Sequence, residues 1–171
     1  MATKSKITYD TRISLLEHLP GMHYVEVPAS IIKKLGGKIK IRLICTLNDS
    51  VSYQCGLVSL GEGKAYITVN AKRLKELKLK VGDVVAVNLE KDDSEYGLEM
   101  PAELSELLSQ DPIGEKRFKG LKPGMQRYIL FYIGQVKSSQ LRIDRVIKLI
   151  GNLKKLKPGT ETFRSMLGIE D

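Results

Sequence analysis

The stretch "YVEVPASIIKKLG", residues 24–36, contains a strand pattern, a proline and the start of a helix in close succession. Val25 and Val27 alternate with polar or amphipathic neighbours, a spacing typical of a strand with one buried face. Pro28 follows directly. Because proline lacks a backbone N–H and fixes φ near the helical value, it suits a junction at which a strand ends and a helix begins. The stretch therefore predicts a strand that turns into a short helix.

Two later stretches align with this one when their tyrosines are superposed: "YITVNAKRLKELKLKVGDVVAV" from Tyr66 and "YGLEMPAELSELLSQ" from Tyr96. Each predicts a strand followed by a helix, and in the second copy Asn70 can cap the helix through its side chain. In the first two copies a glycine and a second apolar strand follow the helix. The third copy has no such strand. The pattern indicates an internal duplication followed by a truncated third copy.

The segment between the first two copies predicts a hairpin. In "ICTLNDSVSYQCGLVSL" two strand-forming runs flank Asn48-Asp49, and "LGEGK" provides the next reversal. Together with a strand from "KSKITYDTRISL", the region holds six or seven short strands with helices only at their ends. This arrangement favours a small barrel over a doubly wound sheet.

The last third of the chain predicts two amphipathic helices. Apolar residues recur at helical spacing from Met125 to Val136 and, after the polar break "KSSQ", from Ile143 to Leu153. Ser138 or Ser139 can cap the second helix, and the two helices are expected to form an antiparallel hairpin. A helical pattern ends before "DP" at residues 111–112. We therefore expect a barrel domain over residues 1–111, a helical region over residues 112–157 and a tail over residues 158–171.

Charge is unevenly distributed along the sequence. Residues 1–111 carry 15 basic and 15 acidic side chains, whereas residues 112–171 carry 13 and 5, so the whole net charge of +8 falls in the last third. Arg142, Arg145, Lys148 and Lys155 lie on one stripe of the second helix, about 20 Å long at ~1.5 Å per residue. The stripe is either a solvated helix face or an anion-binding surface, and Arg142 or Arg145 can instead pair with acids of the barrel.

The repeated unit, above all "LKLKVGDVVAV", resembles the swapped-hairpin unit of the AbrB/MazE/MraZ proteins, which build a double-split β-barrel from two subunits. The order of elements from Tyr9 to Leu108 is similar to a domain of unknown function that shares this barrel and often precedes a YdeI/OmpD-associated, bacteriocin-protection region. The segment "FKGLKPGMQRYILFYIGQVKSSQLRIDRVIKLIGNL" is similar to the YdeI-type pattern. Val136, Gln140 and Leu141 replace the usual Ala, Glu and Thr. The residues at matching positions are Phe118, Leu121, Arg127, Lys137, Arg142 and Arg145.

The resemblance implies a mainly β plus α fold: a small double-split β-barrel with short capping helices, followed by a basic helical hairpin. An internal duplication would supply within one chain what those regulators assemble from two. We therefore expect a monomer or a weak dimer.

Several classes of function are not expected. No apolar run approaches the ~20 residues of a membrane span, and the start of the chain lacks a signal-peptide pattern, so we expect a cytoplasmic protein with no membrane contact. Cys45 and Cys55 are expected to stay reduced. With only His18 and His23 as histidines, the sequence predicts no metal site, no cofactor and no enzymatic activity.

Two classes of function remain. The first is a non-enzymatic binding module whose basic helical region binds a small anion or an acidic protein surface, with Lys137, Arg142 and Arg145 gathered at one helix start. The alternative is a nonspecific nucleic-acid-binding or regulatory protein. The candidate site residues are Arg127, Lys137, Arg142, Arg145, Lys148 and Lys155.

Overall fold

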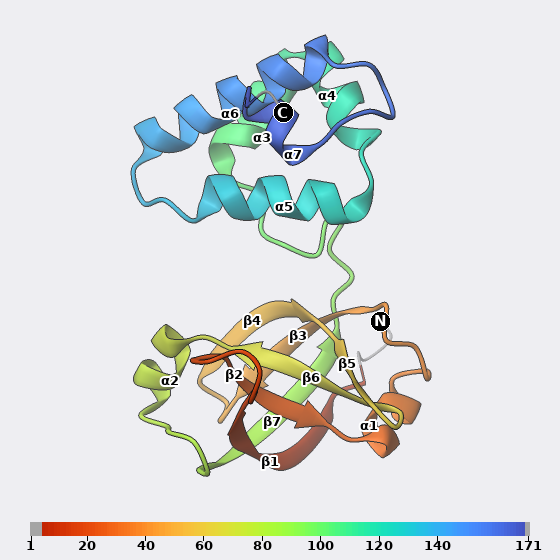
Figure 1. Cartoon of the computed structure of the whole chain (residues 1–171), viewed down its shortest axis with the longest axis vertical. Helices are drawn as coiled ribbons and strands as arrows, with labels where there is room; N and C mark the ends of the chain where they lie inside the picture. The colour runs from red at the N-terminus through yellow and green to blue at the C-terminus, as the bar shows by residue number, and fades with distance from the viewer. Residues whose placement is uncertain (1–4, 170–171) are drawn as a thin grey trace. The chain divides into compact units, whose positions relative to one another are not determined.

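The chain divides into two compact units between Asp93 and Ser94 (Figure 1). The computed structural model describes residues 5–169. The first unit is a curled sheet with two short helices, and the second is helical. The division differs from the expected boundary at residue 111 because Leu104 and Leu108 of the intervening helix pack in the core of the second unit.

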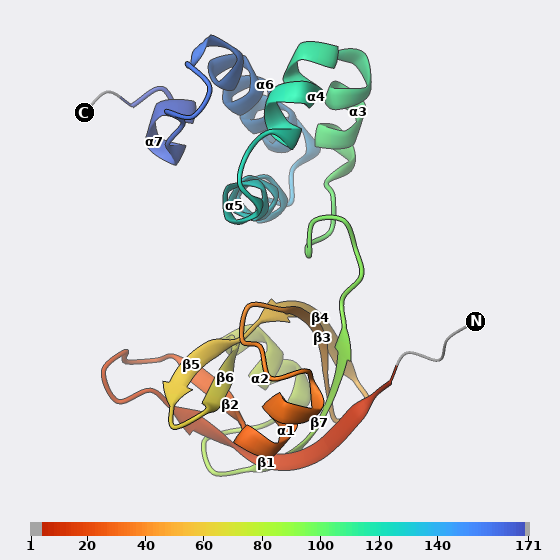
Figure 2. The same cartoon turned by 90° about the vertical axis from the view of Figure 1, so that its right-hand side faces the viewer.

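Within the described residues, seven strands form one antiparallel sheet in the order β4-β3-β7-β1-β2-β6-β5. The first part of β1 pairs with β7 and its last residues pair with β2, so this long strand continues from one half of the sheet into the other (Figure 2). A curled, half-barrel sheet combined with seven helices among the described residues confirms a mixed β plus α class, although helical residues outnumber those in strands. The strands are β1 (Ile7–Leu15), β2 (His23–Val27), β3 (Arg42–Leu47), β4 (Val51–Gly56), β5 (Val58–Gly61), β6 (Lys64–Val69) and β7 (Val84–Lys91).

The two complete repeats pair with each other inside the sheet. Strand β2 pairs with β6 so that Tyr24 faces Thr68 and Glu26 faces Tyr66. Tyr66 and Thr68 lie 42 residues after Tyr24 and Glu26, respectively. Exchanging the two repeats therefore turns the Tyr24–Thr68 pair into the Glu26–Tyr66 pair, as a two-fold relation between the repeats requires. Strands β3 and β7, which follow the helices of the two repeats, also pair with each other. The prediction that the two repeats pair within one chain is confirmed.

The helices of the two repeats, α1 (Ala29–Lys34) and α2 (Ala71–Leu77), begin at equivalent positions, and α2 is one residue longer. Pro28 occupies the N-cap position of α1, whereas the side chain of Asn70 accepts a backbone N–H of α2. After the helices, Gly36 and Lys78 both adopt positive φ, at 105° and 54°. The left-handed conformation turns the chain sharply toward the next strand.

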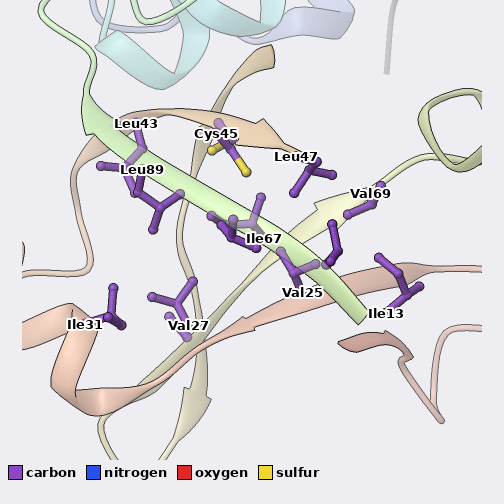
Figure 3. Close-up of a cluster of buried hydrophobic side chains, with 14 of the residues drawn as sticks. Ile13, Val25, Val27, Ile31, Leu43, Cys45, Leu47, Ile67, Val69 and Leu89 are labelled. Carbon is purple, nitrogen blue, oxygen red and sulfur yellow. The ribbon is translucent and has the colours of Figure 1, made fainter. Parts of the chain in front are cut away.

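The core of the first unit lies on the inner face of the curled sheet (Figure 3). Alternate residues of the strands point inward, as the period of two requires. The tight hairpin turn at Asn48 and Asp49 has positive φ at both residues, as a type I′ connection needs. The inward residues labelled in Figure 3 are Ile13, Val25, Val27, Ile31, Leu43, Cys45, Leu47, Ile67, Val69 and Leu89.

The third copy of the repeat departs from the prediction. Its helix forms as α3 (Ala102–Gln110), but residues 96–100 form no strand, so the strand prediction is wrong there. Gly97 has a φ of 72°, which interrupts an extended conformation. Tyr96 instead packs edge-on against Phe118 of the second unit, with ring centroids 5.5 Å apart.

The second unit contains α3, α4 (Pro112–Lys119), α5 (Pro123–Gly134), α6 (Ser139–Lys155) and α7 (Phe163–Met166). Helices α5 and α6 are the predicted pair, and the Ser138 side chain caps α6 by accepting the backbone N–H of Leu141 at 3.3 Å. Helix α4 was not predicted. Asp111 caps it by accepting the N–H of Gly114 at 2.9 Å, so the "DP" interpreted as a domain boundary is a helix start.

The segment predicted as a tail contributes Phe163, Met166 and Leu167 to the second core. Within it, α7 begins at a capping box formed by Thr162 and Ser165. Met166 is fully buried among the core residues of the unit. Residues 158–169 therefore complete the helical unit rather than extend from it.

Candidate functional site

Arg142 and Arg145 hold the end of α5. Arg142 Nε donates to the carbonyl oxygen of Val136 at 2.7 Å, and Arg145 Nη1 donates to that of Tyr132 at 2.6 Å. The last carbonyls of a helix have no partner inside the helix, and Arg145 satisfies the one at Tyr132. Val136 lies just after the end of α5 at Gly134, so Arg142 holds the connection that follows the helix. Arg145 also lies over the Tyr132 ring, 4.0 Å from its centroid. Both arginines thus have structural partners.

Arg142 has an acidic partner as well, but it lies on α3 rather than on the sheet. Its Nη1 is 3.5 Å from Glu103 Oε1, which also accepts the Ser139 hydroxyl at 2.9 Å. Hydrogen bonds from its own backbone N–H and from Ser139, together with the charge of Arg142, hold the pKa of Glu103 below its ordinary value. The ion pair fixes α3 beside the start of α6.

The other four candidate residues remain available to a ligand. Lys137, Lys148 and Lys155 are exposed, and Arg127 is half-buried. Among the residues that the structure describes, none of these four side chains makes a hydrogen bond or an ion pair. The predicted cluster of Lys137, Arg142 and Arg145 therefore contains one freely available cation.

The division of the chain also changes where the charge lies. Residues 94–171 carry 13 basic and 10 acidic side chains, and residues 1–93 carry 15 and 10. The acids of residues 94–111 thus belong with the basic helices. One of them, Asp111, accepts from Lys154 Nζ at 2.6 Å, and this hydrogen bond is the main cause of the lowered pKa of Asp111. The helical unit is only weakly basic.

A groove of about 740 Å³ lies between α3 and α6 of the helical unit. One wall comes from α3 and carries polar and acidic side chains, including Glu103, Glu106 and Gln110. The other comes from α6 and is apolar, with Ile143 and Ile147 exposed by 37% and 57%. The lining residues are Ala102, Glu103, Glu106, Leu107, Gln110, Asp111, Ser139, Ile143, Val146 and Ile147.

Sequence reasoning missed this groove because it placed α3 in the barrel domain. The local signals were present: Glu103, Glu106 and Gln110 are spaced for one helix face, and Ile143 and Ile147 are spaced for one stripe of α6. Only the packing of α3 against α6, visible in Figures 1 and 2, brings the two stripes together.

The two cysteines lie in the core of the first unit. Both are free and buried, on neighbouring strands β3 and β4. The hydrogen bond between the two thiols lowers the pKa of Cys45 and raises that of Cys55, and burial raises it further. Cys45 faces Tyr53 and Cys55 faces Leu43, so the cysteines are diagonal neighbours, at a spacing wider than an unstrained disulfide prefers.

Within residues 5–169, no helix is long and apolar enough to cross a membrane. In the same range, no group of three or more His, Cys, Asp or Glu side chains is arranged to hold a metal ion.

The chain thus consists of a curled antiparallel sheet with two short helices and a helical unit with an open groove. Residues 11–89 match the family described as a domain of unknown function (DUF1905). Residues 97–155 match the family described as Bacteriocin-protection, YdeI or OmpD-Associated. Each match lies within one unit, and the predicted YdeI/OmpD-associated resemblance is confirmed. A comparison with curated proteins finds no match.

Proposed function

We propose that the protein is a non-enzymatic binding module and that the α3–α6 groove holds an apolar helical segment of a polypeptide partner. The observation that carries the proposal is the exposure of Ile143 and Ile147 along a groove of about 740 Å³. Ligand sites are typically apolar hollows of ~300–1,000 Å³ with a few polar groups. A groove between two helices also suits an amphipathic helix, whose apolar stripe can lie along it.

The description of the matched family adds support of a general kind. That family is described by the words "bacteriocin-protection". Bacteriocins are polypeptides, so a groove that binds a polypeptide segment agrees with this description, and binding alone requires no catalysis.

A neutral amphipathic peptide of Leu, Ala and Gln, labelled for fluorescence anisotropy, tests the groove. We expect Ile147→Ser to weaken binding by about tenfold, because ~1.4 kcal/mol of apolar burial is lost. The matched control is Phe131→Ser on α5, since Phe131 is 62% exposed and does not line the groove. Equal weakening by the two substitutions, or no binding by the natural chain, would overturn the proposal.

The second candidate is a basic surface for a small anion, an acidic protein surface or nucleic acid. It is supported by the exposed Lys137, Lys148 and Lys155 and by the 15 basic against 10 acidic side chains of residues 1–93. Binding of nonspecific DNA should weaken with salt at a log–log slope of about −0.9 per phosphate contacted. Replacing the three lysines with Gln should then reduce that slope, and a slope near zero in the natural chain would exclude nucleic acid as the ligand of this surface.

We also propose that the curled sheet is a double-split β-barrel of the AbrB/MazE/MraZ kind. The symmetric pairing of β2 with β6, whose residues are equivalent at a spacing of 42 positions, supports this proposal, because that barrel is built from two equivalent units. A location in the cytoplasm and a monomeric or weakly dimeric state stay predictions.

A further inference from the structure

We propose that the helical segment bound in the α3–α6 groove is cationic, and that its Lys or Arg side chain binds between Glu103 and Glu106. This inference rests on the proposed function of the groove and names the chemistry of its partner. It follows from three features of the acidic wall: the spacing of its glutamates, an unused carboxylate oxygen and an uncompensated charge.

The first feature is spacing. Glu103 and Glu106 are three residues apart on α3, so their carboxylates lie on one face of the helix, and both line the groove. The opposite wall is apolar through Ile143 and Ile147 of α6. A helix that turns its apolar stripe toward α6 presents the adjacent stripe toward α3.

The second feature is an acceptor that the fold leaves unused. The Glu103 side chain is only 12% exposed, and the Ser139 hydroxyl and Arg142 both reach its Oε1 atom. Its Oε2 atom is buried and accepts no hydrogen bond from the residues that the structure describes. A buried carboxylate oxygen is normally hydrogen-bonded. Glu103 lines the groove, so a donor on the bound segment is the partner that we propose for this oxygen.

The third feature is charge. Glu106 Oε1 accepts a hydrogen bond from Gln110 Nε2 at 2.5 Å, and among the described residues the Glu106 carboxylate makes no ion pair. Asp111, farther along the same wall, is instead neutralised by Lys154 at 2.6 Å. Arg142 already pairs with Glu103, so the negative charge left for a partner lies at Glu106, where an acidic segment would be repelled.

The test compares three labelled peptides that share one amphipathic Leu/Ala sequence and carry Lys, Gln or Glu at two positions beside the apolar stripe. The full chain should bind the Lys peptide about tenfold more tightly than the Gln peptide at low salt, and the Glu peptide least tightly. The advantage of Lys should shrink at high salt, because exposed charges are screened.

Two variants locate the cationic site. Glu106→Gln should reduce the affinity for the Lys peptide to that for the Gln peptide in the natural chain. Asp144→Asn removes the same charge from α6 at a residue outside the groove and should keep the full advantage of Lys. Melting temperatures of both variants confirm that the fold is retained.

The outcomes separate this inference from the function on which it rests. If the Gln and Lys peptides bind equally well, the cationic partner is wrong and the apolar groove stands. The same holds if the advantage of Lys survives Glu106→Gln but not Asp144→Asn. If no peptide binds, both the groove and its cationic partner are overturned.

Discussion

At the scale of single residues, the basic side chains of α6 divide into two kinds according to the backbone near them. Arg145 reaches a carbonyl oxygen in the last turn of α5 and Arg142 reaches one just after it, whereas the side chains of Lys148 and Lys155 are exposed and have no partner among the described residues. Sequence spacing groups all four on one stripe. An unpaired carbonyl near a helix end costs free energy, so the two arginines nearest to the end of α5 stabilise the fold and are less available to a ligand.

The first prediction concerns Arg145. Replacing it with Met removes the hydrogen bond to Tyr132 and the cation–π contact, so the free energy of unfolding should fall by about 1–2 kcal/mol. Lys148→Met, three residues farther along α6 and exposed, should change it by less than about 0.5 kcal/mol. Urea unfolding measures both. Equal effects would show that the Arg145 contact is not needed for stability.

The second prediction concerns the phase of β7. Val85 is fully buried in the core of the first unit, while its neighbour Val84 is 53% exposed. Val85→Asp buries an unpaired carboxylate and should cost several kcal/mol, about 3 or more. Val84→Asp should cost about 1 kcal/mol or less by the same thermal or urea measurement. A neutral Val85→Asp would mean that the strand faces the other way.

At the scale of secondary-structure elements, the helical unit depends on close approach between helices that the sequence treats as unrelated. A Cβ added at Gly114 of α4 would lie 2.7 Å from Cγ2 of Ile150 on α6 and 2.8 Å from Oδ2 of Asp111. The glycine therefore lets α4 pack against α6 while Asp111 keeps its cap. By contrast, a Cβ at Gly151, in the middle of α6, would meet nothing within 4 Å.

These two glycines allow a matched prediction. Gly114→Ala should destabilise the unit by about 1–3 kcal/mol through overpacking. Gly151→Ala should stabilise it by about 0.5–1 kcal/mol, because alanine has the higher helix propensity and room is available. Thermal unfolding followed by circular dichroism distinguishes the two. A stabilising Gly114→Ala would contradict the close packing of α4 on α6.

The segment after α6 is held by an ion pair that makes its docking depend on pH. Arg117 Nη2 lies 2.8 Å from Glu161 Oε1, and Arg117 Nη1 donates to the carbonyl oxygen of Leu156 at 2.7 Å. Hydrogen bonds from Arg117, from its own backbone N–H and from Gly159 lower the pKa of Glu161 below its ordinary value of 4.5. The folded state therefore binds this proton less tightly than the unfolded state.

The fourth prediction follows from that sign. The stabilisation from Glu161 is fully present above its unfolded pKa of 4.5 and is lost as the pH falls from there through the lower folded value. Glu161→Gln should be less stable than the natural chain near neutral pH, and the difference should shrink as the solution is acidified. Urea titrations across this range measure it. A difference that does not change with pH would show that the charge of Glu161 has no role.

At the scale of the whole molecule, the described residues form two hydrophobic cores that share no residue. One gathers the inward side chains of the curled sheet with those of α1 and α2, and the other gathers the helices after Ser94. The two family matches, at residues 11–89 and 97–155, fall on either side of the same division. Separate cores indicate separate folding units.

The fifth prediction is that residues 1–93 and 94–171 fold when expressed alone. Each fragment should give a cooperative thermal transition and dispersed amide resonances, and Val85→Asp should affect only the first. A cut after residue 111, at the boundary that the sequence favoured, should instead damage the helical fragment, because it removes Leu104 and Leu108 from its core. Equal stability of helical fragments that start at residues 94 and 112 would contradict this division.

Local features of this protein were determined by the sequence alone. The strand and helix of each complete repeat, the hairpin turn at Asn48 and a serine cap at the start of α6 depend on periodicity and on contacts within a few residues. The internal duplication could also be predicted from the sequence, because similar side chains recur 42 residues apart. These features needed no information about distant segments.

The tertiary structure decided which helices share a core and what the charged residues do. The pattern of α3 shows an apolar face but not the surface that covers it, and covering by α6 creates the groove and transfers five acids to the basic unit. Arg142 reaches Glu103 across 39 residues of sequence, and Arg117 reaches Glu161 across 44. Contacts at such separation depend on packing, because an amphipathic pattern specifies that a face is buried and not which partner buries it.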